Sequence, residues 1–287
     1  MTLDRRAFLS VAASMVAWPA LAVDAPPELT TYERQTGGRI GLYAENLSTG
    51  AKIAWRANER FVMCSTFKAS LVALVLTRID RGQDQLERMI PYSVGDIPDD
   101  WYAPVAKQNV AKGVMTVGDM CAAAVEYSDN TCANLLLARV GGPAALTAFW
   151  RSTGDTMTRL DHNEPQLNRS PPGDPHDTTT PFRMAGTLRR LVLGKVLSPI
   201  SRGRLTGWML NCKTGDNRLR GGLPKDWSIG DKTGNNGEDA SGDIAVAWRT
   251  PDVPVLICAY TQGGSPTASQ VEAVFTEIGR IVGQRLA

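Results

Sequence analysis

The sequence predicts an α+β fold in which both ends of the chain build one lobe of sheet and helices, and the middle builds a second lobe of helices alone. Two observations predict this: strand-like patterns lie near the two ends, and the apolar runs between them are long enough to be helices. A cleft between two such lobes is a favoured place for a ligand. We therefore expect the functional site at their junction.

The lobe of sheet and helices is predicted from short segments at each end. A helix over 27–37 precedes a β-hairpin, whose strands cover 39–46 and 51–56 around Ser48-Thr49-Gly50. Three more segments have strand character: 227–234, 242–249 and 253–262. The chain then ends in a helix with a one-sided apolar stripe made of Val271, Val274, Phe275, Ile278, Ile281 and Val282.

The middle of the chain is predicted to be helical. Ser65 opens an apolar run over 65–79 that is too long for an ordinary strand. Pro143 and Pro181 each stand where the first turn of a helix tolerates proline. Between these helices, residues 161–180 carry four prolines and many short polar residues, which predicts a long loop of specific shape. Loops of this kind are usually functional.

Residues 1–25 predict the compartment. Arg5-Arg6 precede a mildly apolar run that ends in small residues, which is the layout of a cleaved export signal. The twin arginine followed by Ala-Phe-Leu resembles a Tat-type leader, with cleavage expected near Ala22 or Ala25. The alternative, an N-terminal membrane anchor, needs roughly 20 apolar residues, and this run is shorter. We expect a soluble exported protein, periplasmic or secreted.

Charge and cysteine content narrow the range of partners. The chain has 31 basic and 29 acidic residues, and loss of residues 1–25 leaves that balance unchanged, so neither nucleic acid nor a membrane surface is an expected partner. There is no C-x-x-C pair or Cys/His cluster, so no metal site is expected. The odd number of cysteines leaves at least one thiol unpaired, and we expect most of the five to be buried: Cys64, Cys121, Cys132, Cys212 and Cys258.

Two short motifs place hydroxyl, amine and amide groups at helix ends. Ser65 and Lys68 are three residues apart, so on a helix they share a face and the amine can reach the hydroxyl. A lysine held beside a serine can take its proton when burial lowers the pKa of the amine. Ser128-Asp129-Asn130 lies at the end of a predicted helix, where a bend could present both outer residues to a ligand. Each motif alone is also typical of an ordinary helix or turn.

The tripeptide Lys-Thr-Gly occurs twice. At 213–215 it follows a helix and leads into Asp-Asn, which predicts a turn, whereas at 232–234 it ends a strand. An edge strand that carries a cation and a hydroxyl can hold a peptide-like ligand and its carboxylate. We therefore interpret the second copy as functional and the first as a loop.

The loop at 161–180 offers two kinds of base. It contains the two histidines of the chain, His162 and His176, and a Ser-His-Asp triad would need one of them. It also contains Glu164 and Asn168, whose carboxylate and amide could hold a water molecule for hydrolysis. No G-x-S-x-G elbow accompanies the histidines, so Glu164 is the favoured base, although a lone loop glutamate is usually only a surface residue.

Taken together, these motifs resemble those of the class A serine β-lactamases, whose signature is S-x-x-K, S-D-N and K-T-G. The resemblance covers nearly all of 26–287 and includes EPQLN, GDPHDTTTP, TGDNRLRGGLPKDW and DIAVAW. It implies a three-layer α/β/α lobe with an antiparallel sheet, from about 26–60 and 212–287, and an all-α lobe at about 61–211. It also implies one catalytic domain that acts as a monomer without metal or organic cofactor.

The resemblance implies a reaction and the residues that perform it. Ser65 attacks the β-lactam amide of penicillins and cephalosporins and forms an acyl-enzyme, whose hydrolysis confers resistance. Lys68, or Glu164 through a water, removes the serine proton, and the family leaves this choice open. Ser128, linked to Lys232, passes a proton to the departing ring nitrogen. Glu164 and Asn168 position the water that hydrolyses the ester.

The resemblance also implies how the substrate is bound. Backbone amides of Ser65 and Asn235 form the oxyanion hole, and Asn130 binds the side-chain amide of the substrate. The remaining binding residues hold its carboxylate or line the rim of the cleft: Lys232, Thr233, Gly234, Arg218 and Tyr102.

Several departures from the family pattern stand out. His162 occupies the place of a usual arginine, facing an acid that is here Asp177, so we expect a looser loop whose clamp weakens as His162 loses its proton. Some relatives join the position of Cys64 by a disulfide to a residue that is here Asn236. Three alternatives remain: a DD-peptidase, a β-lactam sensor and a non-catalytic periplasmic binder. EPQLN argues against the first, and the absence of a larger membrane receptor argues against the second.

Overall fold

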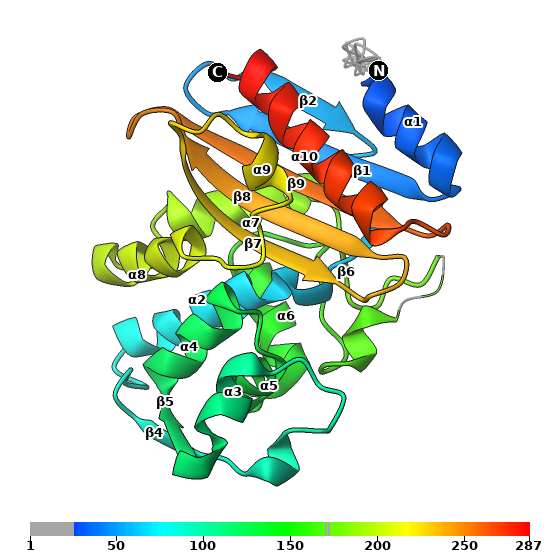
Figure 1. The fold of residues 1–287 in the computed structure, drawn as a ribbon. Coiled ribbons are helices and arrows are strands. Elements are labelled where there is room, and N and C mark those ends of the chain that lie inside the picture. Colours follow the sequence, from blue (N-terminus) through cyan, green and yellow to red (C-terminus); the bar gives the residue numbers. More distant parts are fainter. Residues whose placement is uncertain (1–25, 170, 172) are drawn as a thin grey trace, which may run out of the picture.

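The computed structural model describes residues 26–169, 171 and 173–287, so the predicted leader lies outside the described residues. Its main sheet has five antiparallel strands in the order β2-β1-β9-β8-β7 (Figure 1). The strands come from both ends of the described chain, as the sequence predicts: β1 Arg39–Asn46, β2 Lys52–Trp55, β7 Ser228–Asn235, β8 Ser241–Trp248 and β9 Pro254–Gln262. The expected α+β class is confirmed.

Helices pack on one face of this sheet through the apolar stripe of the last helix. α1 (Pro27–Thr36), α9 (Leu219–Gly222) and α10 (Ala268–Arg285) lie together on that face (Figure 1). Gly222 lets α9 approach α10 closely, because a Cβ there would lie 1.7 Å from the carbonyl oxygen of Thr276. The helices on this face therefore pack through backbone contacts as well as through apolar side chains.

The opposite face of the sheet rests on helices from the middle of the chain. α7 (Pro181–Val192) contacts β1 and β9, and α8 (Pro199–Leu210) contacts β7, so helices cover both faces. α2 (Phe67–Asp80) contacts α4, α5, α6 and α8 and is buried among them (Figure 1). The other helical elements are α3 Pro104–Asn109, α4 Val117–Glu126, α5 Asn130–Val140, α6 Gly142–Ser152, η1 Cys64–Thr66, η2 Val94–Asp96, η3 Val110–Lys112 and η4 Gln166–Asn168.

Two small sheets were not predicted. β3 (Phe61–Val62) pairs with β6 (Thr178–Thr179), and β4 (Met89–Pro91) pairs with β5 (Val114–Thr116). Strands of two or three residues carry too few side chains for an alternating pattern to show. The first pair has a consequence for the site, because it joins the end of the long loop to the segment just before Ser65.

All five cysteines are buried and none forms a disulfide. Within the described part of the chain, no single helix is long and apolar enough to cross a membrane, and only the bent pair Asn130–Val140 and Gly142–Ser152 passes by length and composition.

Candidate active site

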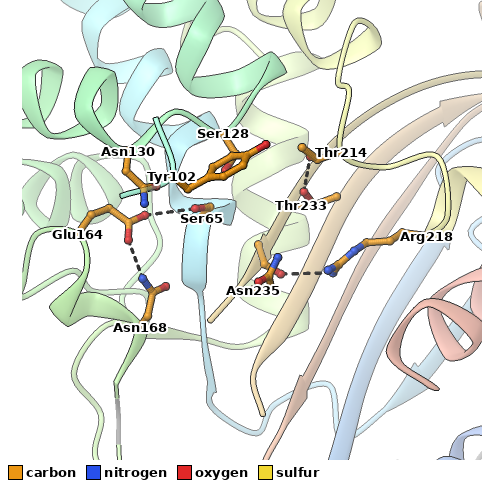
Figure 2. A pocket seen from close by; sticks show the side chains of 11 residues that line it. Ser65, Tyr102, Ser128, Asn130, Glu164, Asn168, Thr214, Arg218, Thr233 and Asn235 are labelled. Carbon is orange, nitrogen blue, oxygen red and sulfur yellow. Dashed lines mark hydrogen bonds between the residues drawn. The ribbon is translucent and has the colours of Figure 1, made fainter. Parts of the chain in front are cut away.

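A cavity of about 390 Å³ opens where β7 meets the turn between α4 and α5 and the long loop (Figure 2). Of the residues that line it, all but Thr214 were predicted as site residues: Ser65, Tyr102, Ser128, Asn130, Glu164, Asn168, Arg218, Thr233, Gly234 and Asn235. The two remaining predicted residues, Lys68 and Lys232, are fully buried beside it. The structure therefore brings the predicted set together from six separate segments.

Ser65 lies one turn earlier than the helix proper. It belongs to η1 (Cys64–Thr66), and α2 begins at Phe67, so the predicted helix start is preceded by a short 3₁₀ turn. Cys64 adopts a φ of 45°, in the left-handed region that is costly for a residue with a side chain. Gly234 of β7 packs against this turn, where a Cβ would lie 2.7 Å from the Ser65 nitrogen. Only glycine lets the strand come this close to the amide of Ser65.

Glu164 joins Ser65 and Lys68. Its Oε1 accepts a hydrogen bond from the Ser65 hydroxyl at 3.2 Å and lies 3.3 Å from Lys68 Nζ (Figure 2). Lys68 Nζ also donates to the Ser128 carbonyl at 2.8 Å and to Asn130 Oδ1 at 2.6 Å. Burial lowers the pKa of Lys68, and the neighbouring carboxylate of Glu164 partly opposes that shift. The expected direct approach of Lys68 to Ser65 is thus replaced by a shared carboxylate.

The position of Glu164 is fixed from two directions. Its Oε2 accepts from Asn168 Nδ2 at 2.6 Å, and its backbone exchanges two hydrogen bonds of 3.1 Å with the Asn134 side chain. Asn134 was not predicted, although its place one turn after Asn130 on α5 is a signal that could have indicated it. The carboxylate is 3% exposed, so its orientation is set by protein and not by solvent.

The turn between α4 and α5 carries Ser128, and its neighbour Asp129 fixes the shape of that turn. Asp129 caps α5 by accepting from Cys132 N at 2.9 Å and also accepts from the backbone of Val105 and Ala106. The middle residue of the S-D-N motif is therefore structural. Ser128, at a φ of 60°, accepts a hydrogen bond from Lys232 Nζ at 3.0 Å. Burial lowers the pKa of Lys232 to about 8.

The first Lys-Thr-Gly copy contributes more than the expected loop. Thr214 lines the cavity, and its hydroxyl lies 2.5 Å from that of Thr233 in the second copy (Figure 2). Arg218, which follows, donates to the carbonyls of Gly234 and Gly242 at 3.3 Å each. A tripeptide in a turn gave no sign of this contact, because only the folded chain brings the two copies together.

Asn236 holds the turn that follows β7. Its Oδ1 accepts from the backbone amides of Glu238, Asp239 and Ala240, and its Nδ2 donates to the carbonyl of Asn168 at 3.4 Å. This side chain therefore links β7 to the loop that carries Glu164.

We expect Asn236→Ala to lower the free energy of unfolding by about 1–2 kcal/mol, because three amides lose their acceptor. Thermal and urea unfolding measure the loss. The matched control is Asn235→Ala, since the Asn235 side chain accepts from only one amide, that of Gly237. An equal loss in both variants would contradict the bracing role of Asn236.

His162 and Asp177 clamp the base of the long loop. His162 Nδ1 lies 2.6 Å from Asp177 Oδ2, and Asp177 Oδ1 accepts from the backbone amides of Asp161 and His162. The hydrogen bond to Asp177 raises the pKa of His162, although its side chain is 52% exposed. The expected pairing of these residues is therefore present.

The clamp predicts a pH dependence of stability. Because the pKa of His162 is higher in the folded than in the unfolded protein, the pair stabilises fully below the unfolded value of about 6.5 and is lost as pH rises through the folded value. We expect His162→Arg, which stays charged, to remove this part of the fall in Tm as pH rises above about 6.5. His176→Gln is the control. Its partner, Asp174, is partly exposed, whereas Asp177 is buried, so loss of the His176 pair should change the pH dependence of Tm less. Identical Tm profiles for wild type and His162→Arg would contradict the clamp.

The chemistry of the cavity is that of a nucleophile with acid and base groups beside it. Among residues 26–169, 171 and 173–287, no group of three His, Cys, Asp or Glu side chains could hold a metal ion. The arrangement instead offers a hydroxyl at a helix start, a carboxylate that can take its proton, and two buried amines.

Comparison with known sequences shows a relationship over nearly the whole described chain. The sequence model of the beta-lactamase enzyme family matches residues 26–286. Beta-lactamase L2 of Stenotrophomonas maltophilia is 45% identical over 261 residues, which cover 91% of this chain and 85% of that protein. A beta-lactamase of Mycobacterium tuberculosis is 46% identical over 261 residues, which cover 89% of this chain and 83% of that protein.

Solved structures agree with these relatives. The class A beta-lactamase of the last common ancestor of Gram-negative bacteria is 50% identical with a TM-score of 0.86, covering 91% of this chain and 98% of that one. A beta lactamase from Xanthomonas campestris is 44% identical with a TM-score of 0.86, covering 91% of this chain and 97% of that one. Sequence and fold agree: the chain belongs to the beta-lactamase enzyme family, within its class A.

Proposed function

We propose that Ser65 is the nucleophile through which this β-lactamase hydrolyses the amide of penicillins and cephalosporins, the reaction that confers resistance. The observation that carries the assignment is the position of Glu164. One of its oxygens lies 3.2 Å from the Ser65 hydroxyl and the other 2.6 Å from Asn168 Nδ2, so a single carboxylate serves the nucleophile and a water site.

In the proposed acylation step, Ser65 Oγ attacks the β-lactam carbonyl while its proton passes to Glu164. Lys68 supports this transfer by position, because its Nζ lies 3.3 Å from the carboxylate that receives the proton. The developing oxyanion is held by the backbone amides of Ser65 and Asn235. The close approach of Gly234 to the Ser65 amide supports this placement.

Opening of the ring requires a proton on the departing nitrogen. We assign its delivery to Ser128, whose hydroxyl accepts from Lys232 at 3.0 Å and from Lys68 at 3.5 Å. Two amines can replace the proton that Ser128 gives away. In deacylation, Glu164 and Asn168 hold the water that attacks the ester, and Glu164 takes its proton.

The substrate is oriented by groups on both walls of the cavity. Thr233, Arg218 and Lys232 hold the carboxylate, and Thr214 supports them through its contact with Thr233. Asn130 binds the side-chain amide from the opposite wall. The remaining contacts are assigned to Gly234, Asn235 and Tyr102, and the last, at 55% exposed, forms the rim.

Three further properties belong to the proposal. The chain is exported, and the twin arginine at 5–6 directs it through the Tat pathway. Residues 26–287 act as one catalytic domain, with the lobes at about 26–60 with 212–287 and at about 61–211. The mature enzyme works as a monomer in the periplasm or outside the cell.

The proposal is tested with purified 26–287 and a chromogenic cephalosporin in large excess. Repeated turnover, with product far exceeding enzyme, is the expected result. A single burst equal to the enzyme concentration would instead indicate a peptidase or a sensor, and would overturn the hydrolytic role of Glu164. The absence of any product would overturn the assignment of Ser65.

A further inference from the structure

The buried carboxylate of Asp243 lies outside the cavity, on the strand next to β7. Asp243, on β8, stands opposite Thr233 of β7 and is fully buried. Its Oδ2 accepts from the backbone amide of Leu219 at 3.2 Å, and its Oδ1 has no hydrogen-bond partner within the described residues. Asp243 was not among the predicted site residues, and no step of the proposed reaction uses it.

The Leu219 amide connects Asp243 to Arg218. Arg218 is the residue immediately before α9, so the bond from Leu219 to Asp243 holds the first residue of the helix, directly after the one that carries the guanidinium. Arg218 is 9% exposed, lines the cavity and lies 5.2 Å over the ring of Phe275. Its hydrogen bonds go to two neutral carbonyls, those of Gly234 and Gly242, and none of the ion pairs in the described residues includes it.

The surroundings of Asp243 explain why no ion pair forms. Burial raises the pKa of Asp243 to about 8, and repulsion from Asp231 adds to the shift, against the opposing effects of Arg218, the Leu219 amide and Lys232. Asp231 itself is paired with Arg220. On the other neighbouring strand, β9, the titratable groups that feel Asp243 are Cys258 and Tyr260. At neutral pH Asp243 is therefore protonated.

We propose that Asp243 is a positioning residue that controls how strongly Arg218 binds the substrate carboxylate. In its neutral form it holds the start of α9 through Leu219 while leaving the charge of Arg218 unpaired and directed at the cavity. This inference rests on the proposed carboxylate-binding role of Arg218. It adds a buried acid outside the cavity to the determinants of substrate affinity.

The sign of the effect follows from the charge that appears on ionisation. Above about pH 8, Asp243 becomes negative and offsets the potential of Arg218, so the contribution of Arg218 to substrate binding falls. Lys232 loses its proton in the same range and also weakens carboxylate binding. The ratio of the KM of Arg218→Ala to that of wild type removes the contribution of Lys232, because both proteins keep Lys232.

The test compares KM and kcat of wild type and Arg218→Ala at about pH 6.5 and about pH 9.5. At the lower pH we expect Arg218→Ala to raise KM for a cephalosporin by about tenfold, since it removes a charged hydrogen-bond donor. At the higher pH we expect a rise of about threefold or less. The methyl ester of the same cephalosporin is the substrate control, because without a carboxylate its KM should respond little to Arg218 at either pH.

The variant Asp243→Asn tests whether Asp243 causes the pH dependence of the KM ratio. Asparagine keeps an acceptor for the Leu219 amide but cannot ionise, so the KM ratio for Arg218→Ala in this background should be equal at both pH values. A merely structural role of Asp243 would not change the pH dependence of that ratio. Asp252→Asn, in an exposed turn, is the control that should behave as wild type.

Two outcomes overturn the inference. A ratio that is independent of pH in the wild-type background does so without any Asp243 variant, and therefore decides the question even if Asp243→Asn does not fold. A pH-dependent ratio that persists in Asp243→Asn also does so. In both cases wild type still turns over the cephalosporin at the lower pH; if it does not, the proposed function itself has failed.

Discussion

Replacing Glu164 by alanine is expected to change repeated turnover into a single burst. Ser65 would still be acylated, because Lys68 loses the carboxylate that opposes the lowering of its pKa by burial and can then take the Ser65 proton as a neutral amine. The ester would then persist, because the water beside Asn168 has lost its base, a loss of about 10²- to 10⁴-fold in kcat. Burst amplitude with a chromogenic cephalosporin and the mass of the intact adduct measure this outcome directly.

Two controls test whether the effect comes from the loss of the base at position 164. One keeps a side chain of similar shape there, and the other removes a glutamate elsewhere. Glu164→Gln keeps a polar group toward Asn168 and should trap the adduct as well, since the base is still missing. Glu87→Ala removes an exposed glutamate elsewhere and should leave turnover intact. If Glu164→Ala continues to turn over near the wild-type rate, another group supplies the deacylating base and the assignment is wrong.

Ser65→Ala is expected to abolish both the burst and the adduct. Without the hydroxyl no ester can form, and we expect kcat/KM to fall by at least about 10⁴-fold. The cavity itself remains, because the polar groups that bind the substrate come from β7, the α4–α5 turn and the loop. Binding of substrate should therefore persist, as measured by quenching of tryptophan fluorescence.

Ser70→Ala is the matched control for this change. Ser70 is buried on α2, after the turn that carries Ser65, and does not line the cavity, so its loss tests packing without touching the cavity. We expect turnover to survive in Ser70→Ala. An adduct in Ser65→Ala, located by peptide mapping, would show that a different nucleophile is used.

The sequence predicted the parts of this protein that depend on local pattern. The strands at 39–46 and 242–249 and the final helix follow from alternation and from an apolar stripe, and each is confirmed. The site residues were expected from the family resemblance that S-x-x-K, S-D-N and K-T-G carry, and the structure places them in and beside one cavity. Strands β3 to β6 were missed, since two or three residues carry no period.

What the sequence could not predict are contacts between segments that are distant in the chain. Thr214 reaches Thr233 only because the two Lys-Thr-Gly copies meet in the folded protein. The spacing from Asn130 on α5 could have indicated that Asn134 faces the site, but no spacing rule relates it to the backbone of Glu164, with which it exchanges two hydrogen bonds. The carboxylate of Glu164 likewise replaces the expected contact from Lys68 to Ser65, because its loop folds back over the start of α2.

The burial of every thiol has a practical consequence. Desolvation raises the pKa of all five cysteines, from Cys64 beside the nucleophile to Cys258 within the sheet, so scarcely any reactive thiolate exists at neutral pH. Alkylating reagents, peroxide and dithiothreitol should therefore leave the native enzyme unaffected. Its folding needs no oxidant, and its integrity does not depend on the redox state of the medium in which it works.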